Sequence, residues 1–414
     1  MTFQKGIDLL VVLASCISLY LGLGLGLPIW YFAAALLLTA RTIWLLLDDS
    51  QPTVSDHLSA FTLVIAFFLA PPDLSDDFQR YLWEGFAANK GYSPYLHSPQ
   101  SLYPILDHPS EGLVNHSHLA TIYPPLAQFC FRIAAWVSYS VYSWKAFILL
   151  SLLPLWFALD RRQFLILISC PAILFEGIWN THLDVLGVMP LCFMVLALSK
   201  RRPGWTGALL AVLTALKIMP LLFSPFCFFF FRGRERLKLV GVFALVILLA
   251  YLPYLNQWEG LFGSFLKFSS EWYFNNPFFH GLEAIFDDRA RILLTGGLLL
   301  SLSALLLIPG PVRWKLIGAW LAMIVFSPTV HPWYLLWLIP LVPEKQRKWL
   351  HLSYMAVFFS YLILIPFRQS GIWEERFWWM IPEWALLLFC MQKLLRPGCY
   401  GFPNVAFKAE TVTD

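Results

Sequence analysis

The sequence predicts an all-α fold, a polytopic bundle of about 14 transmembrane helices with a large structured first outer loop. Composition is the first reason: 59% of the 414 residues are hydrophobic, only 13% are charged and the mean hydropathy is +0.65. A soluble domain carries about a quarter charged residues. Apolar runs of about 20 residues, the length that a bilayer core requires, are the second reason. Examples are residues 9–25, 30–47, 239–255 and 292–308.

Continuous apolar runs indicate helices, because a membrane β-barrel would show alternation over about ten residues. The expected spans lie near residues 7–25, 28–47, 58–71, 143–159, 163–178, 183–199, 204–216, 218–231, 239–256, 291–309, 315–327, 332–343, 350–366 and 380–395.

Basic loops predict the orientation, because cytoplasmic loops are enriched in Lys and Arg. These clusters are at 161–162, 200–202, 232–238, 313–315 and 345–348. Lys200 and Arg232 are close in sequence, so two short helices meeting near Lys217 would return both ends to the cytoplasm. One long tilted span is the alternative. Both termini are then expected to be cytoplasmic, in a protein integral to the inner membrane.

The long polar segments fall on the opposite side. They are 73–120 and 256–290, and the amphipathic stretch 123–138 is expected to lie at the outer interface. Residues 1–414 form a single domain, with the outer loops 73–142 and 257–290 contributing to a site.

The net charge of +4 suits basic loops and not nucleic-acid binding. The scattered cysteines indicate neither a disulfide framework nor a zinc site.

The first group with chemical potential is Asp76 and Asp77, at the outer end of the third expected span. Adjacent carboxylates can bind a divalent cation, or one can act as a base whose proton affinity the other raises. Arg80 is close enough to pair with either. Ordinary solvated loop acids are the alternative, although the nearby aromatic residues favour a structured surface.

A second group joins two expected short spans and contains Glu176, Asn180, His182 and Asp184. Such side chains are costly between apolar helices unless they face a cavity inside the protein. A polar turn at the interface is the alternative.

Two further positions are Lys217 and the stretch containing His331 and Tyr334. A buried ammonium needs an anion, and a phosphate is a fitting partner. His331 could donate to a phosphate oxygen. The alternatives are a snorkelling lysine and an interfacial aromatic belt. All these groups fall on one side of the membrane, which suits a substrate with a lipid tail and a polar head.

These motifs resemble the GT-C superfamily, and within it the bacterial polyprenyl-phosphate-mannose-dependent transferases of glycosyltransferase family 87. The resemblance covers nearly the whole chain. Its motifs are Asp76-Asp77-x-x-Arg80-Tyr81-x-Trp83-Glu84-Gly85, Ile122-Tyr123-Pro124-Pro125, Glu176…Asn180-x-His182-x-Asp184, Lys217-x-x-Pro220 and Ser327-Pro-Thr-Val-His331-Pro-Trp-Tyr334. Glu84 stands where the family more often has Asp, and two spans precede the acidic loop.

The resemblance implies an inverting transfer of mannose or another hexose from a polyprenyl-phosphate donor to a lipid-linked or cell-envelope glycan or glycolipid acceptor, within membrane lipid. Asp77, with Asp76 beside it, would be the base. The expected donor-phosphate ligands are Lys217, Arg80 and His331. The expected sugar and acceptor ligands are Glu176, Asn180, His182, Asp184, Tyr81, Trp83 and Tyr334.

No cofactor is required by this scheme, and Mg²⁺ or Mn²⁺ at Asp76 and Asp77 is the metal-dependent alternative. The rival functions are a lipid-linked polymer ligase and a membrane transporter or flippase. A transporter would predict inverted repeats and charges at mid-bilayer, and the sequence shows neither.

Overall fold

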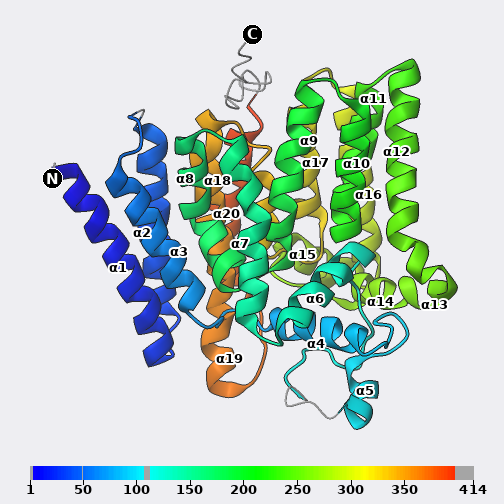
Figure 1. Ribbon diagram of the computed structural model, residues 1–414, viewed down its shortest axis with the longest axis horizontal. Coiled ribbons are helices and arrows are strands. Elements are labelled where there is room, and N and C mark those ends of the chain that lie inside the picture. The colour runs from blue at the N-terminus through cyan, green and yellow to red at the C-terminus, as the bar shows by residue number, and fades with distance from the viewer. Residues whose placement is uncertain (1–2, 49, 107–111, 397–414) are drawn as a thin grey trace.

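A computed structural model describes residues 3–48, 50–106 and 112–396 of the protein (Figure 1). The described part is helical and contains no strand, apart from one isolated parallel bridge between Phe274 and Thr329. The all-α prediction is therefore confirmed. The extreme termini, expected to be cytoplasmic, and residues 107–111 of the first outer loop lie outside the described residues.

Six helical segments of the described chain are long and apolar enough to cross a membrane. They are α1 (Phe3–Leu25), α2 (Ile29–Leu47), α7 (Val141–Ala158), α12 (Gly233–Tyr251) with the turn that follows it, α16 (Arg289–Leu307), and the segment Glu344–Ser370 that contains α18 (Arg347–Phe358) and α19 (Leu364–Ser370). A seventh candidate is α8 (Arg161–Ser169) with the π-helical segment Ile173–Trp179, which are bent by 70°.

The prediction of about 14 spans is not confirmed, because many of the apolar runs are short or broken helices. They form α3 (Val54–Leu69), α9 (Val188–Ser199), α10 (Pro203–Leu216), α11 (Ser224–Phe230) and α17 (Val312–Phe326), with 3₁₀ turns at Leu183–Gly187, Met219–Phe223 and Pro332–Leu338. Further 3₁₀ turns at Leu252–Gln257, Glu344–Gln346 and Phe359–Ile363 lie within the candidate spans. Helix α20 (Phe377–Leu394) has 18 residues but is not among the candidate spans. Hydropathy records apolar residues and does not detect where a helix bends. The expected break at Lys217 is confirmed, because α10 ends at Leu216.

The remaining helices gather at one end of the bundle, the lower edge in Figure 1. They are α4 (Asp77–Asn89), α5 (Pro99–Leu106), α6 (Pro125–Val137), α13 (Trp258–Leu261) and α14 (Gly263–Glu271), and α15 (Pro277–Phe286) lies somewhat higher in this view. Helix α6 packs closely on α4, where a Cβ on Gly85 would overlap the carbonyl of Phe131.

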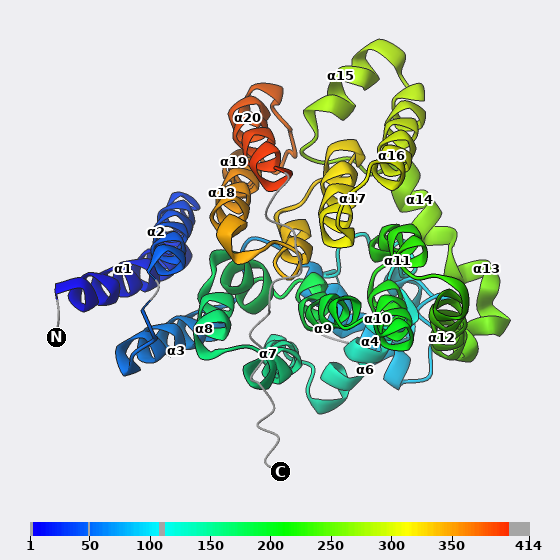
Figure 2. The same ribbon diagram turned by 90° about the horizontal axis from the view of Figure 1, so that it is seen from above.

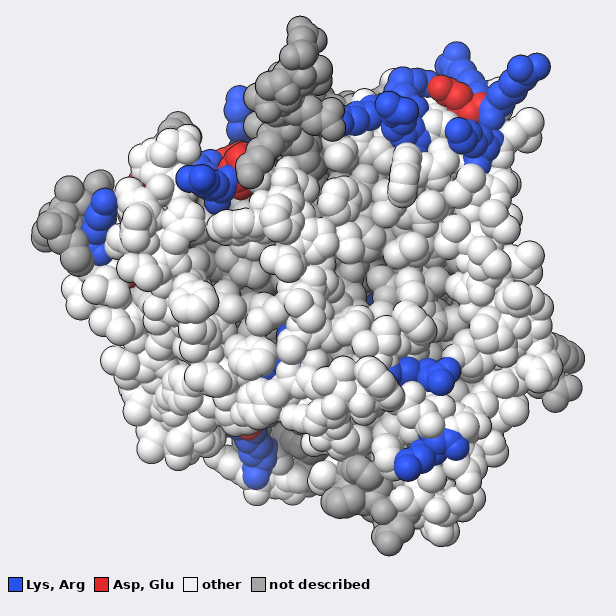
Figure 3. All heavy atoms as spheres, in the orientation of Figure 1, with Lys and Arg blue, Asp and Glu red and all other residues white. Residues whose placement is uncertain are grey.

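The basic loops gather at the opposite, upper edge, where α8, α10 and α12 begin (Figure 1). Figure 3 shows most of the visible Lys and Arg side chains along this edge. Arg162 ties the edge together, since it donates to the carbonyls of Leu45, Leu46 and Asp48 and pairs with Glu344. The two edges of the bundle thus differ in charge, as the sequence predicts.

The outer helices present apolar side chains outward. In α12 only Leu239 is buried, and Leu300 and Leu307 of α16 are 73% and 84% exposed. Such large exposed apolar surfaces indicate contact with lipid. Figure 2 places α1, α12 and α16 at the periphery and α9 toward the middle. The chain is therefore a membrane protein with an aromatic core inside a lipid-facing shell.

Candidate active site

A buried lysine fixes the start of the site. The Lys145 ammonium donates to the carbonyls of Phe67, Phe68 and Ala70, at 3.1, 3.0 and 2.6 Å. These are carbonyls of the last turn of α3, which lack partners within the helix. A cation at that position also interacts favourably with the helix dipole. Lys145 therefore determines where α3 ends and the acidic loop begins.

Two side chains of the 176–184 motif hold the loop that follows. The indole of Trp179 donates to the carbonyl of Pro71 at 2.6 Å, and the Asn180 side-chain oxygen accepts from the Leu74 amide at 3.1 Å. Asn180 is completely buried. Its position suits orientation of the loop that carries Asp77 better than contact with a sugar.

Asp77 begins α4 and lies at the centre of the site. Its carboxylate accepts from the Asn115 amide at 2.9 Å, lies 3.6 Å from Nδ1 of His182, and receives a long contact of 3.5 Å from the Tyr81 hydroxyl. Its side chain is 25% exposed. The same Asn115 amide lies 2.9 Å from the exposed carboxylate of Asp76. Asp77 thus contacts both the protein interior and the surface.

The two acids differ in proton affinity. Desolvation by the surrounding protein, followed by the Asp77 charge, raises the pKa of Asp76. Burial alone would also raise the pKa of Asp77, but the neighbouring His182 ring, together with the Asn115 amide, lowers this pKa below the ordinary range. Asp77 is therefore ionised at neutral pH, which is the form that a general base needs.

His182 is buried beside Asp77 by a strained turn. Thr181, which precedes it, has φ of +61°, a conformation that is unfavourable for a β-branched residue. The Trp144 indole donates to the Thr181 carbonyl at 2.9 Å and supports this geometry. Strain of this kind, about 1–3 kcal/mol, persists where the surroundings enforce it, often at functional sites.

Lys217 lies on the opposite side of the 176–184 motif. Its ammonium contacts both oxygens of Asp184 at 2.8 Å and lies 4.9 Å from the centre of the Tyr334 ring. The Trp337 indole also donates to Asp184, at 2.6 Å. A Cβ on Gly187 would overlap the Trp337 ring, so a residue without a side chain is required there. Lys217 is 18% exposed, and an ammonium has three donors, so one remains for an anion.

His331 joins the site through stacked rings. His182 stacks on Trp333 with 3.7 Å between ring centres, and Trp333 stacks on His331 at 4.0 Å. Phe274 stacks on the other side of His331 at 4.8 Å, and its backbone pairs with Pro328 and Val330. Burial lowers the pKa of His331 to about 3. The ring is therefore neutral at neutral pH and can donate one hydrogen bond.

Arg80 is not assigned to donor phosphate, because its five N–H donors are used within the chain. Nε donates to Glu84 at 2.8 Å. The other nitrogens donate to four carbonyls, those of Asn115, His116, Leu119 and Ala120. Glu84 also accepts from Thr121 and Gln128. Arg80 therefore shapes the loop that presents Asn115 to the acids.

The three aromatic candidates are all buried, and they differ in which residues they contact. Trp83 is 1% exposed and packs against Tyr103 in a small core beneath α5, so it is not positioned to contact a sugar. Tyr81 and Tyr334 are also buried, at 2% and 6% exposure, but they touch Asp77 and Lys217 respectively.

A metal ion would have few protein ligands here. In the described ranges, no group of three His, Cys, Asp or Glu side chains is arranged to hold one. Mg²⁺ commonly uses one or two carboxylates together with water and substrate phosphates. Asp76 and Asp77 fit that more limited role.

Sequence reasoning missed several residues of the site. Asn115 gave no signal, because it is one amide in a long polar loop. Lys145 could have been identified from the sequence, because it is a single cation inside an apolar run. Arg368, a basic residue away from the edge that carries the basic loops, departs from the loop pattern; it pairs with Asp73 at 2.9 Å.

A comparison with known protein families supports a glycosyltransferase. The chain matches the family described as Glycosyltransferase family 87 over residues 121–328, about half of its 414 residues. The match includes the 176–184 motif and Lys217. Searches of curated proteins and of solved structures gave no match. On this match and the expected fold, the chain belongs to glycosyltransferase family 87.

Proposed function

We propose that this glycosyltransferase moves mannose or another hexose from a polyprenyl-phosphate donor to a lipid-linked or cell-envelope glycan, at the outer face of the inner membrane. The observation that carries the proposal is the convergence of Asp77, His182, Lys217 and His331 from separate parts of the chain. They meet at the edge of the bundle opposite the basic loops, where a lipid tail and a polar head could both be accommodated.

We propose the following reaction for this arrangement of residues. An acceptor hydroxyl attacks the anomeric carbon while the bond from that carbon to the phosphate oxygen breaks. Asp77 takes the hydroxyl proton, and polyprenyl phosphate leaves with the bonding electrons. Lys217 supplies charge to the departing phosphate, and His331 supplies a neutral donor. A single displacement inverts the anomeric configuration.

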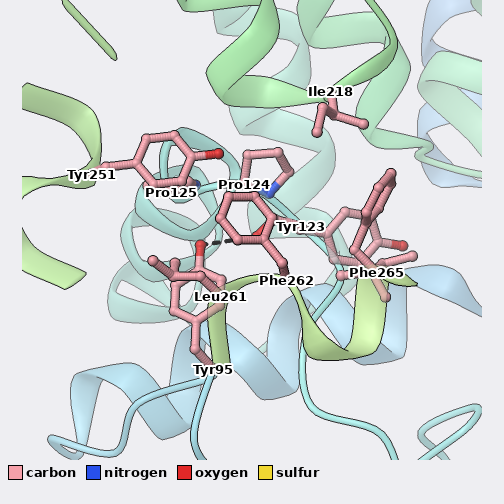
Figure 4. Close-up of a pocket in the computed structure, with 10 residues that line it drawn as sticks. Tyr95, Tyr123, Pro124, Pro125, Ile218, Tyr251, Leu261, Phe262 and Phe265 are labelled. Carbon is pink, nitrogen blue, oxygen red and sulfur yellow. Dashed lines mark hydrogen bonds between the residues drawn. The ribbon is translucent and has the colours of Figure 1, made fainter. Parts of the chain in front are cut away.

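An aromatic pocket supports a lipid-linked donor. Tyr95, Tyr123, Pro124, Ile218, Tyr251, Leu261, Phe262 and Phe265 line it, and the Tyr95 hydroxyl donates to the Tyr123 carbonyl at 3.0 Å (Figure 4). Ile218 follows Lys217 directly, and the Tyr123 ring packs on Tyr81 with 5.3 Å between centres. We propose that the first prenyl units occupy this pocket while the phosphate reaches Lys217.

Transfer of radiolabel by the purified protein in liposomes tests the proposal. Labelled hexose should pass from a polyprenyl-phosphate donor to an extracted glycan acceptor, and nucleotide sugars should give no product. Transfer from nucleotide sugars alone would overturn the donor assignment. A lipid-linked polymer ligase would instead move a preassembled glycan, and a transporter would relocate the donor without consuming it.

Chelation tests whether transfer requires a divalent cation. A metal-free reaction predicts unchanged transfer in excess EDTA, whereas a cation at Asp76 and Asp77 predicts loss of transfer and recovery with Mg²⁺ or Mn²⁺.

A further inference from the structure

Four polar side chains that were expected to bind the sugar or acceptor are enclosed by the protein. Their exposed fractions are 2% or less, and they are Glu176, Asn180, His182 and Asp184. The two oxygens of Glu176 accept from the hydroxyls of Tyr354 and Tyr361, at 2.7 and 2.8 Å. Side chains so enclosed offer little surface to a glycan, so an acceptor longer than one sugar needs a more open surface nearby.

A second pocket offers such a surface, and we call it the acid-lined pocket. It is lined by residues from three segments, 274–275, 359–363 and 375–383. The middle segment is the 3₁₀ turn Phe359–Ile363 that leads into α19, and the last includes the first turns of α20. Helix α19 lies at the lower edge of the bundle in Figure 1, the edge opposite the basic loops.

Asn275 fixes the wall of this pocket. Its φ of +55° is a left-handed conformation, which asparagine tolerates better than most residues. Its backbone amide donates to Glu375 at 2.7 Å, and its side-chain amide donates to Glu383 at 2.6 Å. Its carbonyl accepts from the Trp384 indole at 3.0 Å. The two acids are therefore held in place without a ligand.

Three polar groups of the pocket have hydrogen-bonding capacity left. Glu375 and Glu383 each accept through one carboxylate oxygen, and the other oxygen of each has no hydrogen-bond partner within the described chain. The hydroxyl of Ser360, a residue 8% exposed, has no partner there either. Buried polar groups of native proteins are normally paired, so an unfilled set of this kind indicates a ligand.

The chemistry of the pocket defines that ligand. Ionised carboxylates only accept hydrogen bonds, so the ligand must supply donors. Two acids also repel an anion, which disfavours the phosphate of the donor. The Trp379 ring lines the same pocket, with the Arg376 guanidinium 5.0 Å from its centre. A hexose has hydroxyl donors at its rim and apolar C–H groups on its faces, and it therefore suits both the acids and the ring.

The acid-lined pocket adjoins the reaction site through one residue. Asn275 contacts the two acids, and the preceding Phe274 stacks on His331 with 4.8 Å between ring centres. His331 stacks in turn on Trp333, which stacks on His182 beside Asp77. The aromatic pocket assigned to the prenyl chain instead adjoins the site through residues 123 and 218. Donor and acceptor thus have separate approaches to the same groups.

We propose, resting on the proposed function, that the acid-lined pocket binds a neutral hexose unit of the acceptor glycan, one unit beyond the sugar whose hydroxyl reacts. Glu375 and Glu383 accept from the hydroxyls of this unit, Ser360 completes the hydrogen bonds, and Trp379 packs against one face of its ring. The acceptor then extends past Phe274 and His331 toward Asp77.

Photocrosslinking tests the pocket without relying on transfer. The full-length protein in liposomes is irradiated with an octyl α-mannoside that carries a diazirine on the sugar, and mass spectrometry maps the adducts. Adducts should form at Trp379 and Met380, which line the pocket. Excess unlabelled octyl mannoside should suppress them, whereas octyl phosphate should not. Adducts confined to other segments, or suppression by octyl phosphate, would overturn the proposal.

Ser360→Ala is the mildest variant, because the hydroxyl that it removes has no partner within the described chain. The mannoside concentration that gives half-maximal crosslinking at Met380 should rise about 3- to 10-fold, the usual effect of losing one hydrogen bond. Trp379→Ala should cause a rise at least as large, because it removes the ring surface.

Each pocket variant has a matched control. Ser303→Ala removes an exposed hydroxyl from α16, and Trp378→Ala removes the neighbouring indole, which is 63% exposed and does not line the pocket. Neither control should change the half-maximal concentration. Unchanged values in both pocket variants, or equal rises in their controls, would contradict the assignment.

Steady-state transfer separates this proposal from the proposed function. If the wild type transfers hexose from a polyprenyl-phosphate donor, KM for the glycan acceptor should rise in Ser360→Ala and Trp379→Ala, and KM for the donor should not. Absence of transfer by the wild type would contradict the proposed function, while crosslinking would still decide whether the pocket binds a hexose. Transfer with an unchanged acceptor KM in both variants would overturn the pocket assignment alone.

Discussion

Arg80 and Lys217 show why the role of a single residue is difficult to predict from sequence. Both are cations near the acidic motifs, and both were expected to bind phosphate. Apart from Glu84, the partners of Arg80 are backbone carbonyls 35–40 residues away, whereas Lys217 has one acid and a donor to spare. Backbone partners leave no trace in the sequence, so only the structure separates the two residues.

Replacing Arg80 by Lys should reduce stability more than it changes donor binding. An ammonium cannot reproduce five directed donors, and breaking a buried pair costs about 3–5 kcal/mol. Thermal unfolding in detergent should show a lower midpoint. The folded fraction should retain the wild-type KM for donor, and a large rise in that KM at unchanged stability would return Arg80 to the phosphate site.

Replacing Lys217 by Gln should lower kcat/KM by about 10²- to 10³-fold, the usual loss when one stabilising donor is removed. Lys217→Arg keeps the charge and should recover part of the activity. Equal rates for the two variants and wild type, measured by steady-state transfer, would remove Lys217 from the mechanism.

At the scale of elements, contacts that join helices and loops position the site. Lys145 ends α3, Trp179 and Asn180 hold the following loop, and α6 packs against α4 at Gly85. The sequence predicted the helix break at Lys217, because the basic loops on both sides require the chain to turn back there. It did not predict the strained turn at Thr181, since no local pattern encodes a positive φ at a threonine.

Gly85→Ala tests the contact between α4 and α6. The added methyl would overlap the Phe131 carbonyl, so we expect about 1–3 kcal/mol of destabilisation from overpacking, and reduced transfer because α4 carries Asp77. Gly241→Ala in α12 meets nothing within 4 Å and is the matched control. Equal melting temperatures for the two variants would contradict this packing.

Phe262→Ser tests the aromatic pocket. It should raise KM for a long-chain polyprenyl donor by about 5- to 30-fold, the equivalent of 1–2 kcal/mol. KM for a donor with a very short chain should change little. An equal effect on both donors would place the lipid elsewhere.

At the scale of the whole molecule, charge distribution proved more informative than span counting. Basic loops placed the candidate residues on one edge, and the structure brings Asp77, His182, Lys217 and His331 together there. The count of about 14 spans is not confirmed, because apolar composition is the same in a continuous helix and in two half-helices that meet at a polar break. Those breaks are where the site residues are found.

Cysteine accessibility tests the proposed orientation. In a cysteine-free background, Gln100→Cys in α5 should react with an impermeant maleimide in intact cells, because α5 is at the proposed outer edge. Lys200→Cys at the basic edge should react only after permeabilisation. The reverse pattern would invert the molecule and place the site in the cytoplasm.

The most direct test of the central claim compares Asp77→Asn with Asp76→Asn in the polyprenyl-phosphate transfer assay, at equal protein in the membrane. General-base catalysis contributes about 10²–10⁴-fold, so Asp77→Asn should lose at least 10²-fold in kcat. Asp76, which is exposed and does not contact His182, should lose less than about tenfold on replacement. Wild-type turnover by Asp77→Asn, or the greater loss in Asp76→Asn, would contradict the account.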